Sequence, residues 1–275
     1  MIPHRRRTLK SLAAAAALGT LPVLARAAPG GLPSAAHGDS SAEWTLLRDK
    51  LFGGRPVLAD GSTVQLIAPM RAAYGASVPI KIVSHLAQTP QRWVRRLTVL
   101  VDKNPSPVAA VLALSPAMGQ ADFELRLRVD EYSHVRVVSE LNDGTLHTDS
   151  RYVKTSGGCS APPNRGALQL IGRTQFKLQA PPRFGEINSA EVTVIHPNDT
   201  GFELNQVTVM FIPPHFVRSL RVSYADAPVF DADLDFSVSE NPTLRFNFVP
   251  PGPGELRAEV DDSHEAHFSG ALRLG

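Results

Sequence analysis

The residue whose chemistry stands out in this chain is its only cysteine, Cys159. Gly157 and Gly158 precede it, and serine, alanine and two prolines follow, so no apolar strand surrounds the thiol. A structural cysteine is usually a small hydrophobic residue in a core, and this context does not fit that role. We therefore predict an exposed cysteine on a flexible glycine arm, Gly157-Gly158, which is either a reactive thiol or half of an intermolecular disulfide.

Two histidines are candidates for a base that would activate this thiol. His196 precedes a proline and His215 follows two prolines. A pair with sulfur and imidazole within about 4 Å would make the protein a cysteine-dependent enzyme. No oxyanion-hole motif is visible in the sequence, so this enzyme is the less favoured hypothesis and we predict no catalytic residues.

A third group of candidates lies near the C-terminus, where histidines alternate with carboxylates: Asp261, Asp262, His264, Glu265 and His267. Such residues bind metals, but these have no helix to present them on one face. A turn between two strands, with solvated charges, explains the same pattern. We predict neither a metal nor another cofactor, and a single cysteine excludes a disulfide within the chain.

The N-terminus has the pattern of an export signal, residues 1–27. Arg5-Arg6-Arg7 precede an apolar run, Leu12–Leu18, and Ala25-Arg26-Ala27 has the form of a cleavage site. The arginines resemble a twin-arginine signal, although general secretion signals carry such clusters too. No later apolar run approaches membrane-spanning length, so we predict a periplasmic protein without a membrane span.

Removing this segment reverses the sign of the charge. It contains five of the 28 basic residues and none of the 26 acidic ones, so the formal net charge changes from +2 to −3. A weakly acidic protein lacks the basic surface that phosphate backbones require, which excludes nucleic acid as a partner.

The elements that must position Cys159 are strands. Residues 28–42 are rich in Ala, Pro, Gly and Ser and are predicted to be a disordered lead-in. One short helix is predicted from Glu43 to Leu51, ended by Gly53-Gly54. Short apolar or alternating runs then predict strands at 64–68, 77–83, 95–101, 123–129, 135–141, 145–153, 168–171, 175–178, 190–196, 205–211, 217–224, 234–238, 243–249, 255–260 and 265–274.

The spacing of these strands predicts an all-β protein with two β-sandwich domains in tandem. The first domain would cover residues 43–155 and the second residues 167–275, with a cysteine-bearing linker at 156–166. Alternation along the fourth strand places Arg126 and Arg128 on its solvent face.

The first domain resembles the sulfur-carrier subunit SoxY. The resemblance rests on Asp102–Ala109, on Glu124–Val129 and on the Gly157-Gly158-Cys159 element. SoxY carries sulfur intermediates of thiosulfate oxidation on a cysteine in a GGCGG-type tail. Here Ser160-Ala161-Pro162 replace the last two glycines, and the cysteine is tethered on both sides.

The second domain resembles SoxZ, the partner subunit of SoxY. The matching segments are Ile195–Gly201, Ile212–Val217, Glu240–Phe246 and Asp261-Asp262, although Asn198 replaces the usual methionine. Both families are immunoglobulin-like sandwiches that pair with each other. A SoxY-like domain followed by a SoxZ-like domain resembles the fusion carriers associated with quinoprotein dehydrogenases.

This resemblance implies a periplasmic, non-enzymatic carrier of a sulfur-containing group on Cys159. Its partners would be Sox-type enzymes, cytochromes or a quinoprotein dehydrogenase. An adaptor for a quinoprotein dehydrogenase, with an incidental thiol, is the alternative, and a cysteine-dependent enzyme is the third hypothesis.

Overall fold

The computed structural model describes residues 41–166 and 168–275, which belong to one compact unit. The predicted signal peptide and most of the predicted lead-in lie outside these residues. The predicted helix is present as α1 (Ala42–Phe52), with the Ser41 side chain capping its start and Gly53 in the left-handed conformation at its end. No helix in the described part of the chain is both long and apolar enough to cross a membrane.

The other regular elements are strands and two single-turn helices. The first half of the chain contributes eight strands: β1 (Val57–Leu58), β2 (Val64–Ile67), β3 (Val78–Ser84), β4 (Val94–Val101), β5 (Val108–Leu114), β6 (Phe123–Leu127), β7 (Ser133–Leu141) and β8 (Leu146–Val153). The second half contributes β9 (Thr174–Leu178), β10 (Asn188–Val194), β11 (Val217–Tyr224), β12 (Ala227–Leu234), β13 (Thr243–Phe248), β14 (Gly254–Asp262) and β15 (His267–Leu274).

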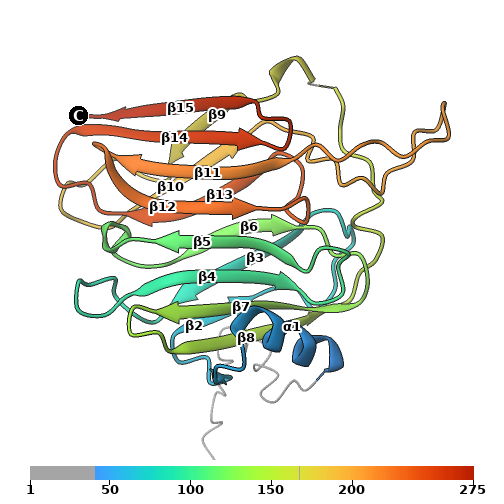
Figure 1. Cartoon of the computed structure of the whole chain (residues 1–275). Coiled ribbons are helices and arrows are strands. Elements are labelled where there is room, and N and C mark those ends of the chain that lie inside the picture. The colour runs from blue at the N-terminus through green and yellow to red at the C-terminus, as the bar shows by residue number, and fades with distance from the viewer. Residues whose placement is uncertain (1–40, 167) are drawn as a thin grey trace, which may run out of the picture. The chain divides into compact units, whose positions relative to one another are not determined.

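Three predicted strands are wrong. Residues 168–171 form a 3₁₀ turn, η2 (Leu168–Leu170), a counterpart of η1 (Pro116–Met118). Residues 205–211 belong to a loop that extends away from the sheets (Figure 1). The strand predicted at 234–238 ends at Leu234 and begins earlier, at Ala227.

The strands form two sheets that pack face to face as an immunoglobulin-like sandwich (Figure 1). One sheet has nine strands in the order β1-β8-β7-β4-β5-β12-β11-β14-β15, and the other has six in the order β2-β3-β6-β13-β10-β9. All pairings are antiparallel except that of β1 with β8. Alternating burial along β3 and β10 shows that each places one face in the core.

Both sheets continue from the first half of the chain into the second. The nine-stranded sheet does so through β5 and β12, which pair from Leu114–Phe230 to Ala110–Leu234, and the six-stranded sheet through β6 and β13. Behind these ladders, Phe230 makes edge-to-face contacts with Phe123 and Phe246, with ring centroids 5.3 and 5.0 Å apart. The core therefore runs across the junction of the two halves. The domain boundaries at 155 and 167 stay a prediction.

Candidate functional site

Cys159 lies in the connection between β8 and η2, which we call the cysteine loop (residues 155–166). Its side chain is buried, with 1% of the residue exposed, so the prediction of an exposed thiol is wrong for this structure. The physical reason is that the loop is covered by residues distant in sequence, from both halves of the chain. Burial raises the pKa of the thiol to about 12, and the nearby Asp130 carboxylate acts in the same direction.

The two glycines hold the loop against the first half of the protein. The N–H of Gly157 donates to the carbonyl of Asp130 at 2.8 Å, and that of Gly158 to the carbonyl of Val129 at 3.1 Å. A Cβ atom on Gly158 would lie 2.4 Å from the carbonyl oxygen of Gly75, so only glycine allows this approach. In this structure the predicted flexible arm is thus a docked segment, and its role as an arm stays a prediction.

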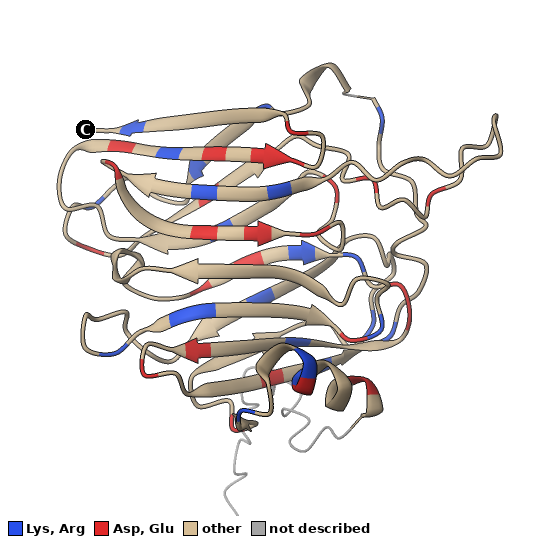
Figure 2. Cartoon of the chain, viewed as in Figure 1, with Lys and Arg blue, Asp and Glu red and all other residues tan. Residues whose placement is uncertain are grey.

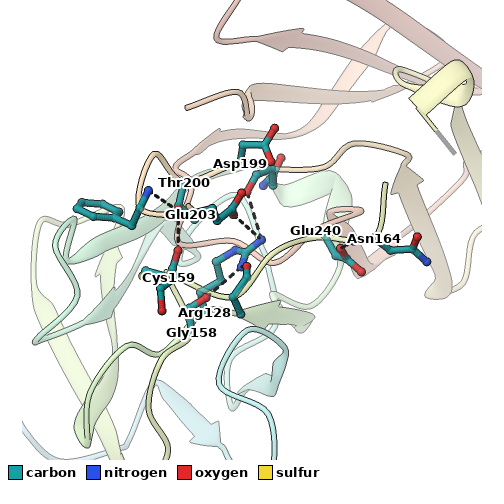
Figure 3. Close-up of polar contacts among 12 residues, drawn as sticks. Arg128, Gly158, Cys159, Asn164, Asp199, Thr200, Glu203 and Glu240 are labelled. Atoms are coloured by element: carbon teal, nitrogen blue, oxygen red, sulfur yellow. Dashed lines mark hydrogen bonds and ion pairs between the residues drawn. The ribbon is translucent and has the colours of Figure 1, made fainter. Parts of the chain in front are cut away.

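Arg128 fixes the loop on both sides of the cysteine. Its Nη1 donates to the carbonyl oxygens of Gly158 and Ala161 at 3.0 and 3.1 Å (Figure 3), and its Nη2 to that of Asn198 at 3.3 Å. The residue is 1% exposed, so the predicted solvent-facing position is wrong. The alternation that predicted it ends with β6 at Leu127, and Arg128 follows the strand.

Two carboxylates of the second half surround the Arg128 guanidinium and that of Arg165. Arg165 forms an ion pair with Asp199, and the oxygens of Glu203 lie 3.9 Å from Arg128 Nη2 and 3.5 Å from Arg165 Nη2. Burial, together with the adjacent Asp199 carboxyl, raises the pKa of Glu203 to about 7. The Glu203 carboxyl group, which lies beside the loop that holds the thiol, therefore titrates near neutral pH.

One more bond joins the second half directly to the cysteine. The hydroxyl of Thr200 donates to the carbonyl oxygen of Cys159 at 2.6 Å, while the N–H of Cys159 donates to the Asp130 carboxylate at 3.0 Å. The main chain at Cys159 is therefore held from both halves. The sequence analysis gave no role to Thr200 or Glu203. Thr200 lies in the segment Ile195–Gly201 that carries the SoxZ resemblance, and Glu203 follows it by two residues.

The two candidate histidines lie beside Asp262 and form no hydrogen bond with the sulfur. His215 Nε2 is 2.8 Å from Asp262 Oδ2, and His196 Nε2 is 3.6 Å from the same oxygen. No hydrogen bond to the Cys159 sulfur is formed by any residue in the described ranges. In this structure neither candidate histidine is therefore hydrogen-bonded to the thiol as a general base would be.

The donor atoms of His196, His215 and Asp262 lie within 4.8 Å of one another, a spacing compatible with a metal ion. However, the backbone N–H of Asn198 donates to His196 Nδ1 at 3.1 Å, so a neutral His196 carries its proton on Nε2. A metal at Nε2 would require a fully deprotonated ring. Within the cluster His215 is hydrogen-bonded to Asp262, whereas His196 Nε2 is buried without a hydrogen-bond partner among the residues that the structure describes. Burial lowers the pKa of His196 to about 4.

The other residues of the predicted C-terminal cluster lie where β14 turns into β15. Asp261 pairs with His267 across this hairpin, and the Asp262 carboxylate accepts the N–H groups of His264 and Ala266 at 2.8 and 2.9 Å. The hairpin turn predicted from the sequence is present. The sequence did not indicate that Asp262 would meet two histidines from another loop.

Comparison with protein families assigns both halves. Residues 48–159 match the family of the sulfur oxidation protein SoxY, and residues 176–273 match that of the sulphur oxidation protein SoxZ. The chain is a SoxY-like domain followed by a SoxZ-like domain. Cys159 is the last residue of the SoxY match, and Asn198–Glu203, which cover the cysteine loop, belong to the SoxZ-like half.

Solved structures show more distant likenesses. The sulfur carrier protein SoxY from Chlorobium limicola f thiosulfatophilum is 24% identical over 41% of this chain and 91% of its own, with a TM-score of 0.35. A superoxide reductase (neelaredoxin) from Ignicoccus hospitalis is 14% identical over 41% of this chain and 87% of its own, with a TM-score of 0.27. No curated protein matches the chain. The assignment rests on the two family matches.

Proposed function

We propose that the protein is a carrier that holds a sulfur-containing group covalently on Cys159 and presents it to partner enzymes. The observation that supports this most is that the chain's only cysteine ends the SoxY match and sits on a loop held by a few polar contacts. Export to the periplasm by residues 1–27 is part of the proposal. Sox-type enzymes, cytochromes or a quinoprotein dehydrogenase would be the partners, and the carrier itself would catalyse no reaction.

A carrier of this kind needs two states of the cysteine loop. In the closed state described here, the thiol is buried and protonated, which protects it from unspecific reaction. In the open state, the bonds from Arg128 and Thr200 are broken, together with those that the backbone N–H groups of residues 154 and 157–159 donate to Met70, Val129 and Asp130. The chain from Val153 to Cys159 would then extend at most about 20 Å, enough to bring the sulfur to a partner's surface.

The burial of the thiol also favours a second candidate, an adaptor for a quinoprotein dehydrogenase in which the thiol has no role. Intact-mass spectrometry of protein isolated from its native cells without reductant separates the two. A carrier has added mass on wild-type protein and none on Cys159→Ser. If the protein is unmodified and resists alkylation under every growth condition, the adaptor function is supported and the carrier function is rejected.

A further inference from the structure

Between β10 and β11 the chain forms a projecting hairpin, which we call the finger (residues 199–215; Figure 1). At its base, Asp199 and His215 exchange backbone hydrogen bonds of 2.7 and 3.0 Å. Toward its end, Leu204 pairs with Phe211, and the N–H of Asn205 donates to the carbonyl of Met210 at 2.9 Å. The finger is therefore a hydrogen-bonded hairpin.

The tip of the finger exposes apolar side chains to solvent. The exposed fractions are 90% for Val207, 70% for Val209, 66% for Met210 and 67% for Phe211. No residue from Leu204 to Phe211 is charged, and Figure 2 shows this end of the hairpin as a stretch without coloured residues. A soluble protein gains no stability from such a patch, which is typical of a surface that binds another protein.

The tip is also held in a strained conformation. Val209 has φ = 55°, in the left-handed region that a β-branched residue rarely adopts. The side chain of Asn205 fixes the turn by accepting the N–H groups of Val207 and Thr208 at 2.9 and 3.1 Å. A preordered apolar tip loses little entropy on binding, which favours rapid docking.

The base of the finger is part of the contact that closes the cysteine loop. Thr200 binds the carbonyl of Cys159, and Glu203 lies beside Arg128 (Figure 3). The same hairpin thus carries an apolar tip and the residues that cover the thiol. A protein that binds the tip is placed directly at the loop that holds Cys159.

We propose that the tip of the finger inserts into an uncharged, apolar pocket on the enzyme that exchanges the carried group with Cys159. This inference rests on the proposed carrier function. Because the tip carries no charge, recognition depends on apolar burial and varies little with salt.

The exposed area argues for such a partner over a second copy of this chain. Six finger residues expose between 43% and 90% of their surface: Phe202, Leu204, Val207, Val209, Met210 and Phe211. At about 200 Å² for each fully exposed side chain, they supply about 760 Å², which is below the roughly 1,000 Å² or more that each side of an obligate homodimer interface contributes. The finger suits a brief encounter, which a carrier requires because it must leave its partner.

The test compares adduct occupancy on Cys159 in full-length protein isolated from native cells, measured by intact mass. The tip variant combines Val207→Ser, Met210→Ser and Phe211→Ser, and the control combines Leu46→Ser with Met70→Ser, which are 73% and 61% exposed elsewhere. We expect the tip variant to lose at least tenfold in occupancy and the control to match wild type. The alkylation rate of purified, unloaded tip variant should equal that of wild type, because the loop contacts are unchanged.

Each other outcome overturns the inference in a recognisable way. If the tip variant carries as much adduct on Cys159 as wild type does, docking through the finger is rejected and the carrier function is retained. A wild type without any adduct rejects the carrier, and finger docking with it. Dimeric wild type that becomes monomeric in the tip variant, by sedimentation velocity, identifies a second copy as the occupant.

Discussion

The cysteine loop and the finger meet at one end of the sandwich. In each of them the exposure of the side chains is the opposite of what the residue composition predicts. The cysteine loop is built from glycine, serine and proline, yet Cys159 within it is 1% exposed. The finger is rich in valine, methionine and phenylalanine, yet Val207 is 90% exposed. Short residues allow the first to approach other backbones closely, while the second presents side chains that find no cover in its own chain. The residue composition of a loop therefore determines how closely it can pack against other backbones. Whether the loop is buried depends on contacts with segments distant in sequence.

The largest expected effect separates close packing from flexibility in the cysteine loop. Gly158→Ala would place a methyl 2.4 Å from a carbonyl oxygen, whereas a methyl on Gly157 meets only Ser160 Oγ at 3.9 Å and is disfavoured by φ = 71°. The clash in Gly158→Ala should weaken the closed state by about 3 kcal/mol, so that the loop opens about 100-fold more often. The left-handed alanine in Gly157→Ala costs only about 1–2 kcal/mol. Alkylation of Cys159 should accelerate about 100-fold in Gly158→Ala and about tenfold in Gly157→Ala. Equal rates in the two variants would show that both glycines serve flexibility.

The second prediction concerns Glu203, which the finger contributes to the cysteine loop. Its folded pKa of about 7 exceeds the unfolded value of 4.5, so folding retains a proton that the unfolded chain loses. This stabilisation is complete below pH 4.5 and disappears as the pH rises to 7, a change of roughly 3 kcal/mol. The difference in unfolding free energy between wild type and Glu203→Gln, measured by urea unfolding across this range, should show this change.

His196 provides the internal check on that experiment, because its effect has the opposite sign. Its folded pKa of about 4 lies below the unfolded value of 6.5, so its stabilisation is lost as the pH falls from 6.5 toward 4. Subtracting the Glu203→Gln curve from the wild-type curve removes this contribution. A difference that does not vary with pH would contradict the assignment of the proton to Glu203.

A smaller effect is expected from the bond between the two regions. Thr200→Val removes the hydroxyl that binds the Cys159 carbonyl, at a cost of about 1 kcal/mol. The alkylation rate of Cys159 should rise about fivefold. The control is Thr148→Val, which removes an equally buried bond from a threonine hydroxyl to the Val137 carbonyl, 3.0 Å long, within the sheet. If the control accelerates alkylation as much, the effect reflects global stability.

The smallest effect concerns strain at the tip of the finger. Glycine adopts the φ of 55° observed at Val209 without steric cost, so Val209→Gly should stabilise the protein by about 0.5 kcal/mol after the larger entropy loss of glycine is included. The same variant should lower adduct loading, because the apolar side chain and the ordered turn are both lost. Thermal unfolding measures the stability and intact mass measures the adduct loading. If stability and loading both increase in Val209→Gly, the strained conformation has no role in docking.

The sequence predicted most of the strands. It missed the two-residue edge strand β1 and the two strands at the junction of the halves, β5 and β12. β5 (Val108–Leu114) lies in the middle of the nine-stranded sheet and is a continuous apolar run without alternation, although Ala113 within it is exposed. β12 contains Pro228, Asp231 and Asp233, which mask a strand whose alternate residues Phe230, Ala232 and Leu234 are buried. β5 and β12 are strands because they pair with each other across more than 100 residues of sequence. The local sequence of each segment does not show this pairing.

The candidate site shows a similar division. The sequence singled out Cys159, and it named His196, His215 and Asp262 separately. What it did not supply was the cover on the thiol, because Arg128 follows β6 whereas Thr200 and Glu203 belong to the finger, and these two segments meet only in the fold. A buried arginine immediately after a strand has the same local sequence as an exposed one.

Strand pairing across the two halves also changes how the protein responds to dilution. When β5 and β12 belong to separate chains, their association is second order and weakens as the concentration falls. On one polypeptide the ladder from Leu114–Phe230 to Ala110–Leu234 forms at an effective concentration set by the connecting chain, in the millimolar range for short tethers. The surroundings of Cys159 therefore stay assembled at any level of expression, and one molecule always contains the two halves in equal number.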